Sequence, residues 1–205
     1  MQKNKQNRIN IAYACNDNYV LPLCCAIKSV LTNLKDSGYF VCIHVLCSNT
    51  LSHKNKNLIK TIEDKSSKID FVKVDDNLFS KFHLEKNTHI TRETYYRYLL
   101  PDLLENIDKV LYLDCDTVAL NDISEIFNIN IDDYYIAGVS DFSEYAFKKR
   151  LSLNKYCNAG MLLFNLKKCD RKICQKNLLN TQLNIMTQFL FKIRMLSMLF
   201  FKKKY

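Results

Sequence analysis

The amino-acid sequence predicts an α/β fold with a mainly parallel central sheet. Two observations carry this prediction. Apolar runs typical of strands buried on both faces alternate along the chain with segments of helical periodicity. Polar or acidic residues directly follow several of these apolar runs, and the carboxyl ends of parallel strands form the crevice in which ligands bind. The same pattern therefore predicts a fold class and the edge of the sheet where a site is expected.

The first predicted unit is a strand followed by a helix. Residues 9–15, INIAYAC, form a near-continuous apolar run, and the polar turn at 16–19 follows at once. Apolar residues then recur with helical spacing from Leu23 to Leu34. Pro22 is compatible with the first turn of that helix. Strand, polar turn and helix make the first half of a βαβ unit.

Two further strands are predicted over residues 40–47 and 69–74, with a helix over about 52–64 between them. His44 lies inside the first of these apolar strands. We interpret it as a core histidine with a hydrogen-bond partner rather than as a metal ligand, because a buried polar side chain is normally paired.

An aromatic helix is predicted over residues 91–100, TRETYYRYLL, capped by Thr91 and ended near Pro101. The simple interpretation is a core helix with a solvated arginine, Arg97. The alternative is that Arg97 lies against the floor of a site, because it shortly precedes an acidic strand end.

That strand end lies in residues 109–120, KVLYLDCDTVAL, where the apolar run 110–113 leads into Asp114 and Asp116. Residues two apart in an extended segment face the same side, so both carboxylates can meet one hard cation. An acidic turn that caps the following segment is the alternative. Such a solvated turn does not require the apolar runs that flank these acids on both sides.

Further along, residues 122–127 predict a helical turn and residues 135–139 a strand that ends at Asp141. Asp141 is either another acid at a strand end or a helix cap. The segment 158–160, Asn-Ala-Gly, precedes the apolar run 161–164. Its small residues allow a close approach of the backbone to a ligand, or simply make a turn.

Composition excludes several classes of protein. The chain has 205 residues, which suits one domain, and its 48% apolar content with 12 Tyr and 12 Phe excludes disorder. Its nine cysteines include no C-x-x-C pair, which argues against a disulfide framework and a zinc site. Reduced, mostly buried thiols in a cytosolic protein are the better interpretation. The opening MQKNKQNR contains no apolar segment of secretory type.

The net charge of +9 is concentrated at the two ends. Residues 1–8 carry +3 and residues 167–205 carry +9, so residues 9–166 carry −3. Nucleic-acid binding favours a basic face on the domain itself. We therefore expect no nucleic-acid partner.

The glycine content limits how a nucleotide can be held. Only Gly38, Gly138 and Gly160 are present, so the sequence contains neither G-x-G-x-x-G nor a P-loop. A bound nucleotide would need a metal ion to neutralise its phosphates. Asp114 and Asp116 are the candidates to hold that ion.

Three blocks now reveal a family resemblance. They are IAYACNDNYV (11–20), TRETYYRYLLP (91–101) with KVLYLDCDTVAL (109–120), and YCNAGMLLFNL (156–166). In this order they resemble glycosyltransferase family 8, a group of retaining, nucleotide-sugar-dependent enzymes with a GT-A (Rossmann-like) fold. The resemblance covers about residues 9–168.

The resemblance implies a nucleotide-sugar site made from all three blocks, with Tyr19 stacking on the uracil and Arg97 reaching the donor sugar or diphosphate. Asn16 stands where many members have aspartate, and its amide can both donate and accept. The residues implied are Ala14, Asn16, Asn18, Tyr19, Arg97, Asp114, Asn158 and Ala159.

The resemblance also implies a metal and a reacting face. Asp114 and Asp116 would bind Mn²⁺ (or Mg²⁺), which bridges the phosphates and improves UDP as a leaving group. The hydroxyls of the transferred sugar would be contacted by Asp141, Asn158 and Ala159. The residues implied at the catalytic centre are Arg97, Asp141 and Asn158.

The implied function is transfer of galactose or glucose from UDP-galactose or UDP-glucose to a saccharide acceptor such as lipopolysaccharide, with retention. The implied location is the cytoplasm, with peripheral association to the cytoplasmic membrane. Two alternatives stay open. One is an inactive remnant that binds UDP-sugar and metal only. The other is a membrane-surface protein that uses residues 189–205, an apolar stretch interrupted by Lys192 and Arg194.

The expected organisation is a polar lead (1–8), a glycosyltransferase domain (9–175) and an atypical basic, apolar tail (176–205). The Asp-Gln-Asp and H-x-x-G-x-x-K-P-W segments of the family are absent. Back-translating residues 189–205 and reading from the third base of each codon permits S-I-Q-D-Q-D-A-L-N-V-V-F-Q-K-K-I, which suggests a reading-frame shift. Such a tail would not complete the sheet and would leave a poorly stable, weakly active protein. Reading the DNA across codons 168–205 tests this hypothesis.

Overall fold

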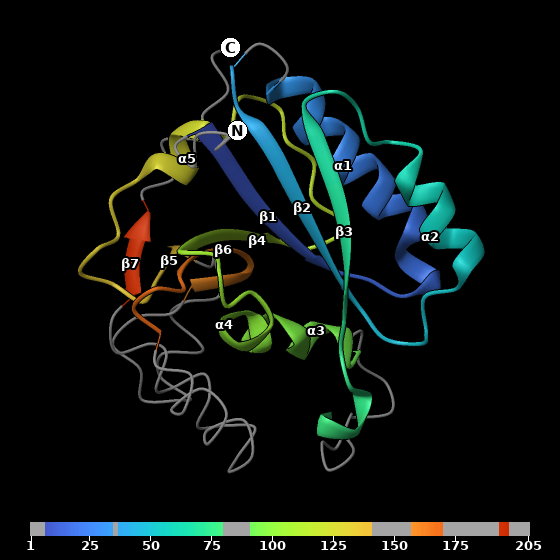
Figure 1. Cartoon of the computed structure of the whole chain (residues 1–205). Helices are drawn as coiled ribbons and strands as arrows, with labels where there is room; N and C mark the ends of the chain where they lie inside the picture. Colours follow the sequence, from blue (N-terminus) through green and yellow to red (C-terminus); the bar gives the residue numbers. More distant parts are fainter. Residues whose placement is uncertain (1–6, 35–36, 80–90, 141–156, 170–192, 197–205) are drawn as a thin grey trace.

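The computed structural model describes residues 7–34, 37–79, 91–140, 157–169 and 193–196. These residues form a mixed sheet flanked by helices (Figure 1). The strand order is β3-β2-β1-β4-β6-β5-β7. The strands are β1 (Arg8–Ala14), β2 (Phe40–Cys47), β3 (Ser67–Lys73), β4 (Lys109–Leu113), β5 (Ile136–Ser140), β6 (Cys157–Asn165) and β7 (Ile193–Leu196).

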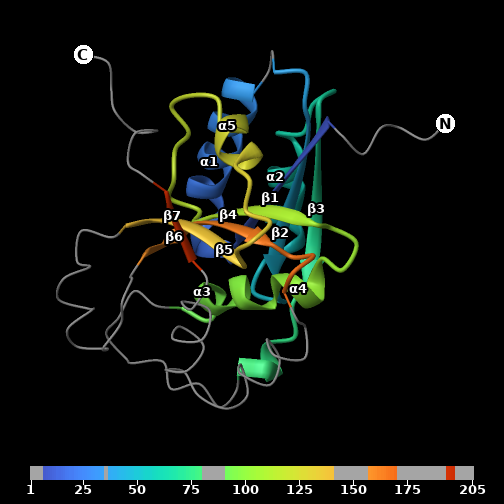
Figure 2. The ribbon, with the colours of Figure 1, turned by 90° about the vertical axis from the view of Figure 1, so that its left-hand side faces the viewer.

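The first half of the sheet is parallel, as the sequence predicts. Strands β3, β2, β1 and β4 run in the same direction. Strand β6 is antiparallel to both of its neighbours, β4 and β5, and β7 pairs in parallel with β5 (Figure 2). The result is an α/β fold in which the amino end of β6 meets the carboxyl ends of β1 and β4 at one edge.

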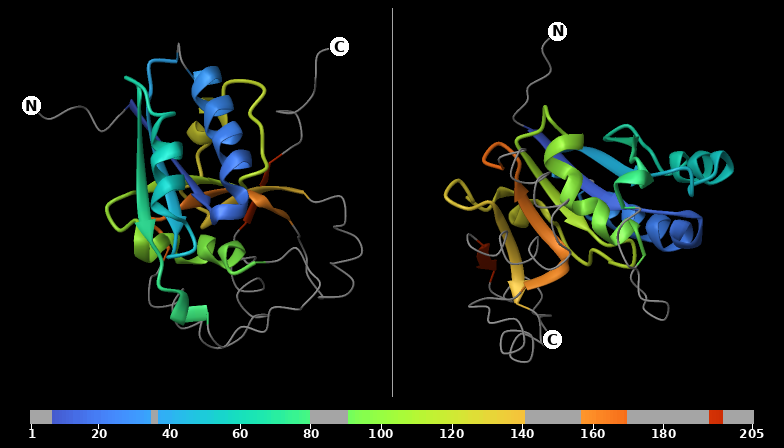
Figure 3. Two further views of the ribbon diagram at one scale, coloured as in Figure 1. Left: turned by 90° about the vertical axis from the view of Figure 1, so that its right-hand side faces the viewer. Right: turned by 90° about the horizontal axis from the view of Figure 1, so that it is seen from below.

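Helices cover both faces of the sheet (Figures 1 and 3). Those on the side of α1 pack against Ile9, Ile11 and Tyr13 of β1, whereas the short helices of the other side pack with Ala12 and Ala14. This alternation along one strand is the period of two expected when both faces are buried. The helices are η2 (Asp17–Tyr19), α1 (Val20–Leu34), α2 (His53–Lys60), η3 (Asp76–Phe79), α3 (Glu93–Tyr96), η4 (Arg97–Leu99), α4 (Leu100–Leu103) and α5 (Ser124–Asn128).

The predicted single helix over 91–100 is wrong in detail. The segment is divided into α3, η4 and α4, and Thr91 does not cap it, since the residue before α3 is Arg92. One physical reason lies in Arg97, whose Nε donates to the carbonyl oxygen of Thr94 at 2.6 Å and so competes for a backbone acceptor. Pro101 does not end the helical path, because it occupies the first turn of α4, where its missing N–H has no helical partner to lose.

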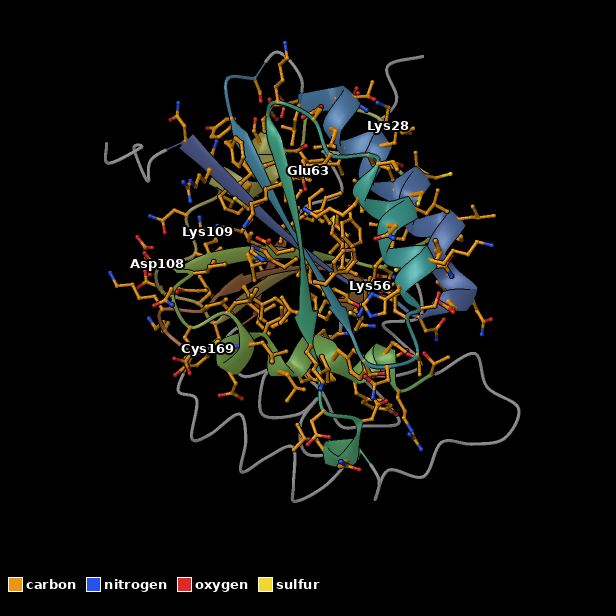
Figure 4. The ribbon with its side chains drawn as sticks, turned by 45° about the vertical axis from the view of Figure 1, so that its right-hand side comes forward. Lys28, Lys56, Glu63, Asp108, Lys109 and Cys169 are labelled. Atoms are coloured by element: carbon orange, nitrogen blue, oxygen red, sulfur yellow. The ribbon has the colours of Figure 1, made fainter. Side chains whose placement is uncertain are left out.

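Lys109, the first residue of β4, fixes α5 to the sheet (Figure 4). Its Nζ donates to the carbonyl oxygens of Phe127 and Ile129 at 3.1 and 2.9 Å. These carbonyls end α5, so the lysine supplies donors that the helix terminus lacks. Burial lowers the pKa of Lys109.

His44 is a buried core residue, as predicted. Its Nε2 lies 3.2 Å from Asn10 Oδ1 on the adjacent strand. Burial lowers the pKa of His44 to about 4, so the imidazole is neutral at physiological pH.

A frame-shifted tail was expected not to complete the sheet, yet part of the tail does pair with it. Residues 193–196 form β7, which pairs with residues 136–139 of β5 at the end of the sheet. An edge strand exposes unpaired backbone donors and acceptors, and a short extended segment satisfies them whatever its side chains. Whether the tail arises from a frame shift stays a prediction. In the described part of the chain, no helix combines the length and apolar character needed to cross a membrane.

Candidate active site

A cavity of about 280 Å³ lies at the carboxyl ends of β1 and β4. Its walls come from the turn after β1, from the segment that leads into α3 and η4, and from the end of β4. These stretches are far apart in sequence and meet because β1 and β4 are adjacent parallel strands. The lining residues are Ala14, Asn16, Tyr19, Thr91, Glu93, Thr94, Arg97, Tyr112, Asp114, Cys115 and Asp116.

Asp114 is held in place by two donors from the cavity floor. Arg97 is only 3% exposed, and its Nη2 lies 3.2 Å from Asp114 Oδ1. The Tyr112 hydroxyl donates to the same oxygen at 3.0 Å, and the guanidinium lies 4.6 Å from the centre of the Tyr112 ring. Burial raises the pKa of Tyr112 well above its usual value, so the hydroxyl stays protonated as a donor. One carboxylate oxygen of Asp114 is therefore fixed from two sides.

The other carboxylate oxygen of Asp114 faces Gly160 of β6. The Asp114 N–H donates to the Gly160 carbonyl at 2.9 Å, which continues the pairing of β4 with β6. A Cβ atom at Gly160 would lie 2.7 Å from Asp114 Oδ2 and 3.0 Å from Asn158 Oδ1. The absence of a side chain at Gly160 thus leaves room around Oδ2.

Arg97 also connects the two halves of the site. Besides its contact with Asp114, its Nη1 donates to the carbonyl oxygen of Ala159 in β6. Together with the bond to Thr94, these contacts join the helical segment, β4 and β6 around one buried guanidinium. A buried cation with fixed donors is suited to orienting carboxylate or phosphate oxygens.

The chain turns sharply at the acidic motif. The Thr117 hydroxyl and N–H both donate to the Asp114 carbonyl, at 2.8 and 3.2 Å. Ala119 is then bound to α1 through its N–H to Ser29 Oγ and its carbonyl to Asn33 Nδ2, at 2.9 and 3.0 Å. These bonds leave Asp116 exposed at the cavity while the chain passes to the α1 side.

The turn after β1 is held by hydrogen bonds of its own side chains, Asn16 and Asp17. Asn16 Oδ1 accepts from the Asn18 N–H at 3.0 Å, so Asn16 caps η2 with its amide oxygen. Asp17 points to the start of α2, where Oδ1 accepts from the Ser52 N–H and from Asn55 Nδ2, both at 2.8 Å. The bond from the Ser52 backbone is the main reason that the pKa of Asp17 is lowered. Asp17 therefore joins the turn after β1 to the start of α2 and does not line the cavity.

The structure brings most of the predicted site residues to this cavity: Ala14, Asn16, Tyr19, Arg97, Asp114 and Asp116. Asn18 and Asn158 are exposed beside it, and Ala159 contributes only the carbonyl bound by Arg97. Asp141 lies outside the described residues. The roles implied for all these residues stay predictions.

The lining residues that sequence reasoning missed are Thr91 (taken for a helix cap), Glu93, Thr94, Tyr112 and Cys115. The only available signal was Glu93, a charged residue on the aromatic segment four positions before Arg97. Cys115 is buried between the two acids, and its Sγ donates to the Ala14 carbonyl at 3.0 Å. The described cysteines are free and, apart from Cys24 and Cys25, buried, as expected.

No group of three His, Cys, Asp or Glu side chains able to hold a metal ion occurs among the described residues. Asp114 and Asp116 nevertheless fit a partial metal site. Both line one cavity, and Asp114 Oδ2 has space in front of it because residue 160 is glycine. Mg²⁺ and similar hard ions are commonly held by one or two carboxylates together with substrate phosphates.

Comparison with known proteins identifies the family of the chain. The model of the family described as "Glycosyl transferase family 8" matches residues 10–204. The chain belongs to glycosyl transferase family 8. The match continues past residue 168, where the sequence resemblance was expected to end.

Two curated relatives and one solved structure illustrate the family likeness. General stress protein A of Bacillus subtilis (strain 168) is 29% identical over 181 residues, covering 86% of this chain and 62% of that protein. A putative glycosyltransferase of Haemophilus influenzae is 30% identical over 188 residues, covering 87% of this chain and 56% of that protein. The chain thus spans less than two thirds of the length of both relatives.

The structural comparison identifies the fold. The galactosyltransferase LgtC, solved with donor and acceptor sugar analogues, superposes with a TM-score of 0.77 and 27% identity, covering 93% of this chain and 74% of LgtC. The fold of this family 8 chain is therefore the GT-A fold that the resemblance implied.

Proposed function

We propose that this family 8 chain transfers a hexose, galactose or glucose, from a UDP-sugar to a saccharide acceptor such as lipopolysaccharide, with retention of configuration. The observation that carries the proposal is the cavity in which Asp114 and Asp116 lie beside the buried Arg97. The likeness of the whole chain to LgtC, which was solved with donor and acceptor sugar analogues, supports a donor and an acceptor site.

In this proposal Asp114 and Asp116 hold Mn²⁺ (or Mg²⁺), which would supply positive charge to the diphosphate leaving group. Arg97 keeps Asp114 oriented through Oδ1, which leaves Oδ2 as the available ligand. Tyr19 offers its ring to the uracil base. Asp141 and Asn158 contact the transferred sugar, as the resemblance implies.

We also propose a cytoplasmic location with peripheral association to the membrane. Free, buried thiols are typical of proteins in reducing compartments. The basic, apolar residues 189–205 supply the type of segment that lies at an anionic interface. No nucleic-acid partner is proposed, because residues 9–166 carry a net charge of −3.

The direct test measures UDP release from UDP-galactose and UDP-glucose with Mn²⁺, together with UDP binding by calorimetry. A transferase without acceptor is expected to hydrolyse its own donor slowly and to release UDP faster when a saccharide acceptor is added. Binding of UDP without release from either donor would instead identify an inactive remnant. Absence of both binding and release would contradict the proposed function.

Replacing Tyr19 with alanine is expected to weaken UDP binding by about 1 to 3 kcal/mol, the usual value of stacking one base on an aromatic ring. Because Tyr19 is 36% exposed and lies outside the hydrophobic core, its loss should lower the melting temperature less than the loss of a core tyrosine. Calorimetry and thermal unfolding measure the two effects.

Tyr39→Ala is the matched control for Tyr19. Tyr39 packs against the core away from the cavity, and its hydroxyl accepts from Asn128 Nδ2 at 2.8 Å. This variant should lose stability and keep its affinity for UDP. A Tyr19 variant that melts much earlier with unchanged affinity would make Tyr19 a structural residue.

A further inference from the structure

Glu93 is a nearly buried carboxylate in the wall of the cavity. It is the first residue of α3, is 7% exposed and lines the cavity together with Asn16 and Tyr19. None of the ion pairs between described side chains includes Glu93. Buried acids are almost always paired, because taking a charge out of water is costly. A buried acid at the wall of a ligand cavity therefore points to a donor on the ligand.

One oxygen of Glu93 is already positioned by the protein. The Thr50 hydroxyl donates to Glu93 Oε1 at 3.2 Å and lies 3.0 Å from Ser48 Oγ. Thr50 also accepts from the Asp17 N–H through its carbonyl at 3.2 Å. The loop after β2 thus connects Glu93 to the turn that contains Asn16 and Tyr19. An ionised carboxylate accepts about four hydrogen bonds, so acceptor capacity remains for a ligand.

Asn16 complements Glu93 as a donor. Its Oδ1 is engaged by the Asn18 N–H, so the side chain offers its NH₂ group to the cavity it lines. The wall of one cavity therefore contains a hydrogen-bond acceptor, a donor and the aromatic ring of Tyr19. An acceptor and a donor beside a ring form a recognition site for the edge of a planar heterocycle.

The acceptor-only character of a carboxylate discriminates between nucleobases. Uracil and guanine carry a ring N–H flanked by a carbonyl oxygen, whereas cytosine and adenine have an unprotonated ring nitrogen at the corresponding position. A carboxylate accepts from the first pair and repels the lone pair of the second. The Asn16 amide can donate to the flanking carbonyl.

We propose that Glu93 accepts a hydrogen bond from N3–H of uracil and is the residue that selects UDP over CDP. This inference rests on the proposed function, because it assumes that the cavity holds the donor nucleotide. It assigns Glu93 to specificity and gives it no part in sugar transfer.

The test compares UDP and CDP binding to the full chain with Mn²⁺ by calorimetry, in the wild type and in Glu93→Gln. The glutamine can still accept from Thr50 and keeps the size of the side chain. A hydrogen bond to a charged group is worth enough to change affinity about tenfold to a hundredfold. We expect the wild type to prefer UDP by such a factor, and the variant to lose most of that preference.

Asp17→Asn is the matched control, because Asp17 is an exposed acid next to Asn16 that does not line the cavity. Its UDP-to-CDP ratio should equal that of the wild type. N3-methyl-UDP tests the same bond without any mutation: the wild type should bind it at least about tenfold more weakly than UDP.

The outcomes separate this inference from the proposed function. One outcome is that the wild type binds UDP but the Glu93 variant keeps the full preference for UDP over CDP, or that N3-methylation of UDP has no effect on binding. Glu93 then does not recognise the base, and the proposed UDP-sugar site is unaffected. A preference for GDP, or equal affinity for UDP and CDP, also overturns the assignment. If no nucleoside diphosphate binds, the proposed function fails and this inference fails with it.

Discussion

Replacing Asp116 with asparagine is expected to remove Mn²⁺-dependent UDP binding. Asp116 is exposed at the cavity, beside the carboxylate of Asp114 that Arg97 orients. An amide carries no charge and is a poor ligand for a hard cation, which prefers carboxylate oxygen. The loss should exceed the roughly 10- to 100-fold that follows mutation of residues supporting a metal ligand. Calorimetry with Mn²⁺ and with a chelator measures the metal-dependent part.

Asp122→Asn is the control for Asp116. Asp122 is also an exposed acid of the same loop region, but its Oδ1 accepts from the Ser124 N–H at 2.7 Å and the residue does not line the cavity. This variant should bind UDP and metal like the wild type. Equal losses from the two substitutions would show that the acidic motif is not the metal site.

The acidic strand end could be located from the sequence because its apolar run matches the burial of that strand in the fold. Residues 110–113 form a strand buried on both faces, and such strands read as continuous apolar runs. The same reasoning located β1 and β2 almost to the residue. Where a strand is half-exposed, as in β3, the predicted start at residue 69 differs from the observed Ser67.

Strand direction could not be predicted from periodicity. Residues 161–164 of β6 form a continuous apolar run like that of a parallel strand, yet β6 is antiparallel to both neighbours. Side-chain alternation is the same in both arrangements, so only the connection and the pairing decide the direction. This direction matters for the site, because it brings Ala159 and Gly160 at the amino end of β6 to the carboxyl end of β4.

The contacts of Arg97 and Glu93 were beyond sequence reasoning for a related reason. An arginine or glutamate on an aromatic helix is compatible with a solvated face and with a cavity wall alike. Whether such a side chain is solvated or lines a cavity depends on partners distant in sequence, which are Asp114 for Arg97 and Thr50 for Glu93. Because buried charges need such partners, only the assembled fold reveals them.

Replacing Gly160 with alanine is expected to impair metal-dependent UDP binding more than it impairs folding. The new Cβ would lie 2.7 Å from Asp114 Oδ2, a distance that forces one of the two groups to move. The Gly160 backbone is fixed by its bond to the Asp114 N–H and by its N–H to Asn158 Oδ1 at 2.8 Å. The carboxylate should therefore move, and it is half of the proposed metal site.

The Asp114 side chain has few other conformations available to it. Its Oδ1 is bound by Arg97 and Tyr112, so rotation that relieves the clash at Oδ2 also disturbs these two contacts. Misplacing a metal ligand reduces affinity in the same way as losing a supporting residue, by about 10- to 100-fold. Titration of Mn²⁺ in the presence of UDP measures this effect, and thermal unfolding measures the change in stability.

Gly138→Ala is the matched control for Gly160. Gly138 lies in β5 and is also crowded, since a Cβ there would lie 3.1 Å from Leu162 Cδ2 and 3.2 Å from Cys157 Cβ and Sγ. These are apolar packing contacts, and Gly138 does not line the cavity. Overpacking there should lower stability by about 1 to 3 kcal/mol and leave Mn²⁺ affinity unchanged. If Gly160→Ala instead binds Mn²⁺ and UDP as the wild type does, the free space around Asp114 Oδ2 has no role in holding the metal.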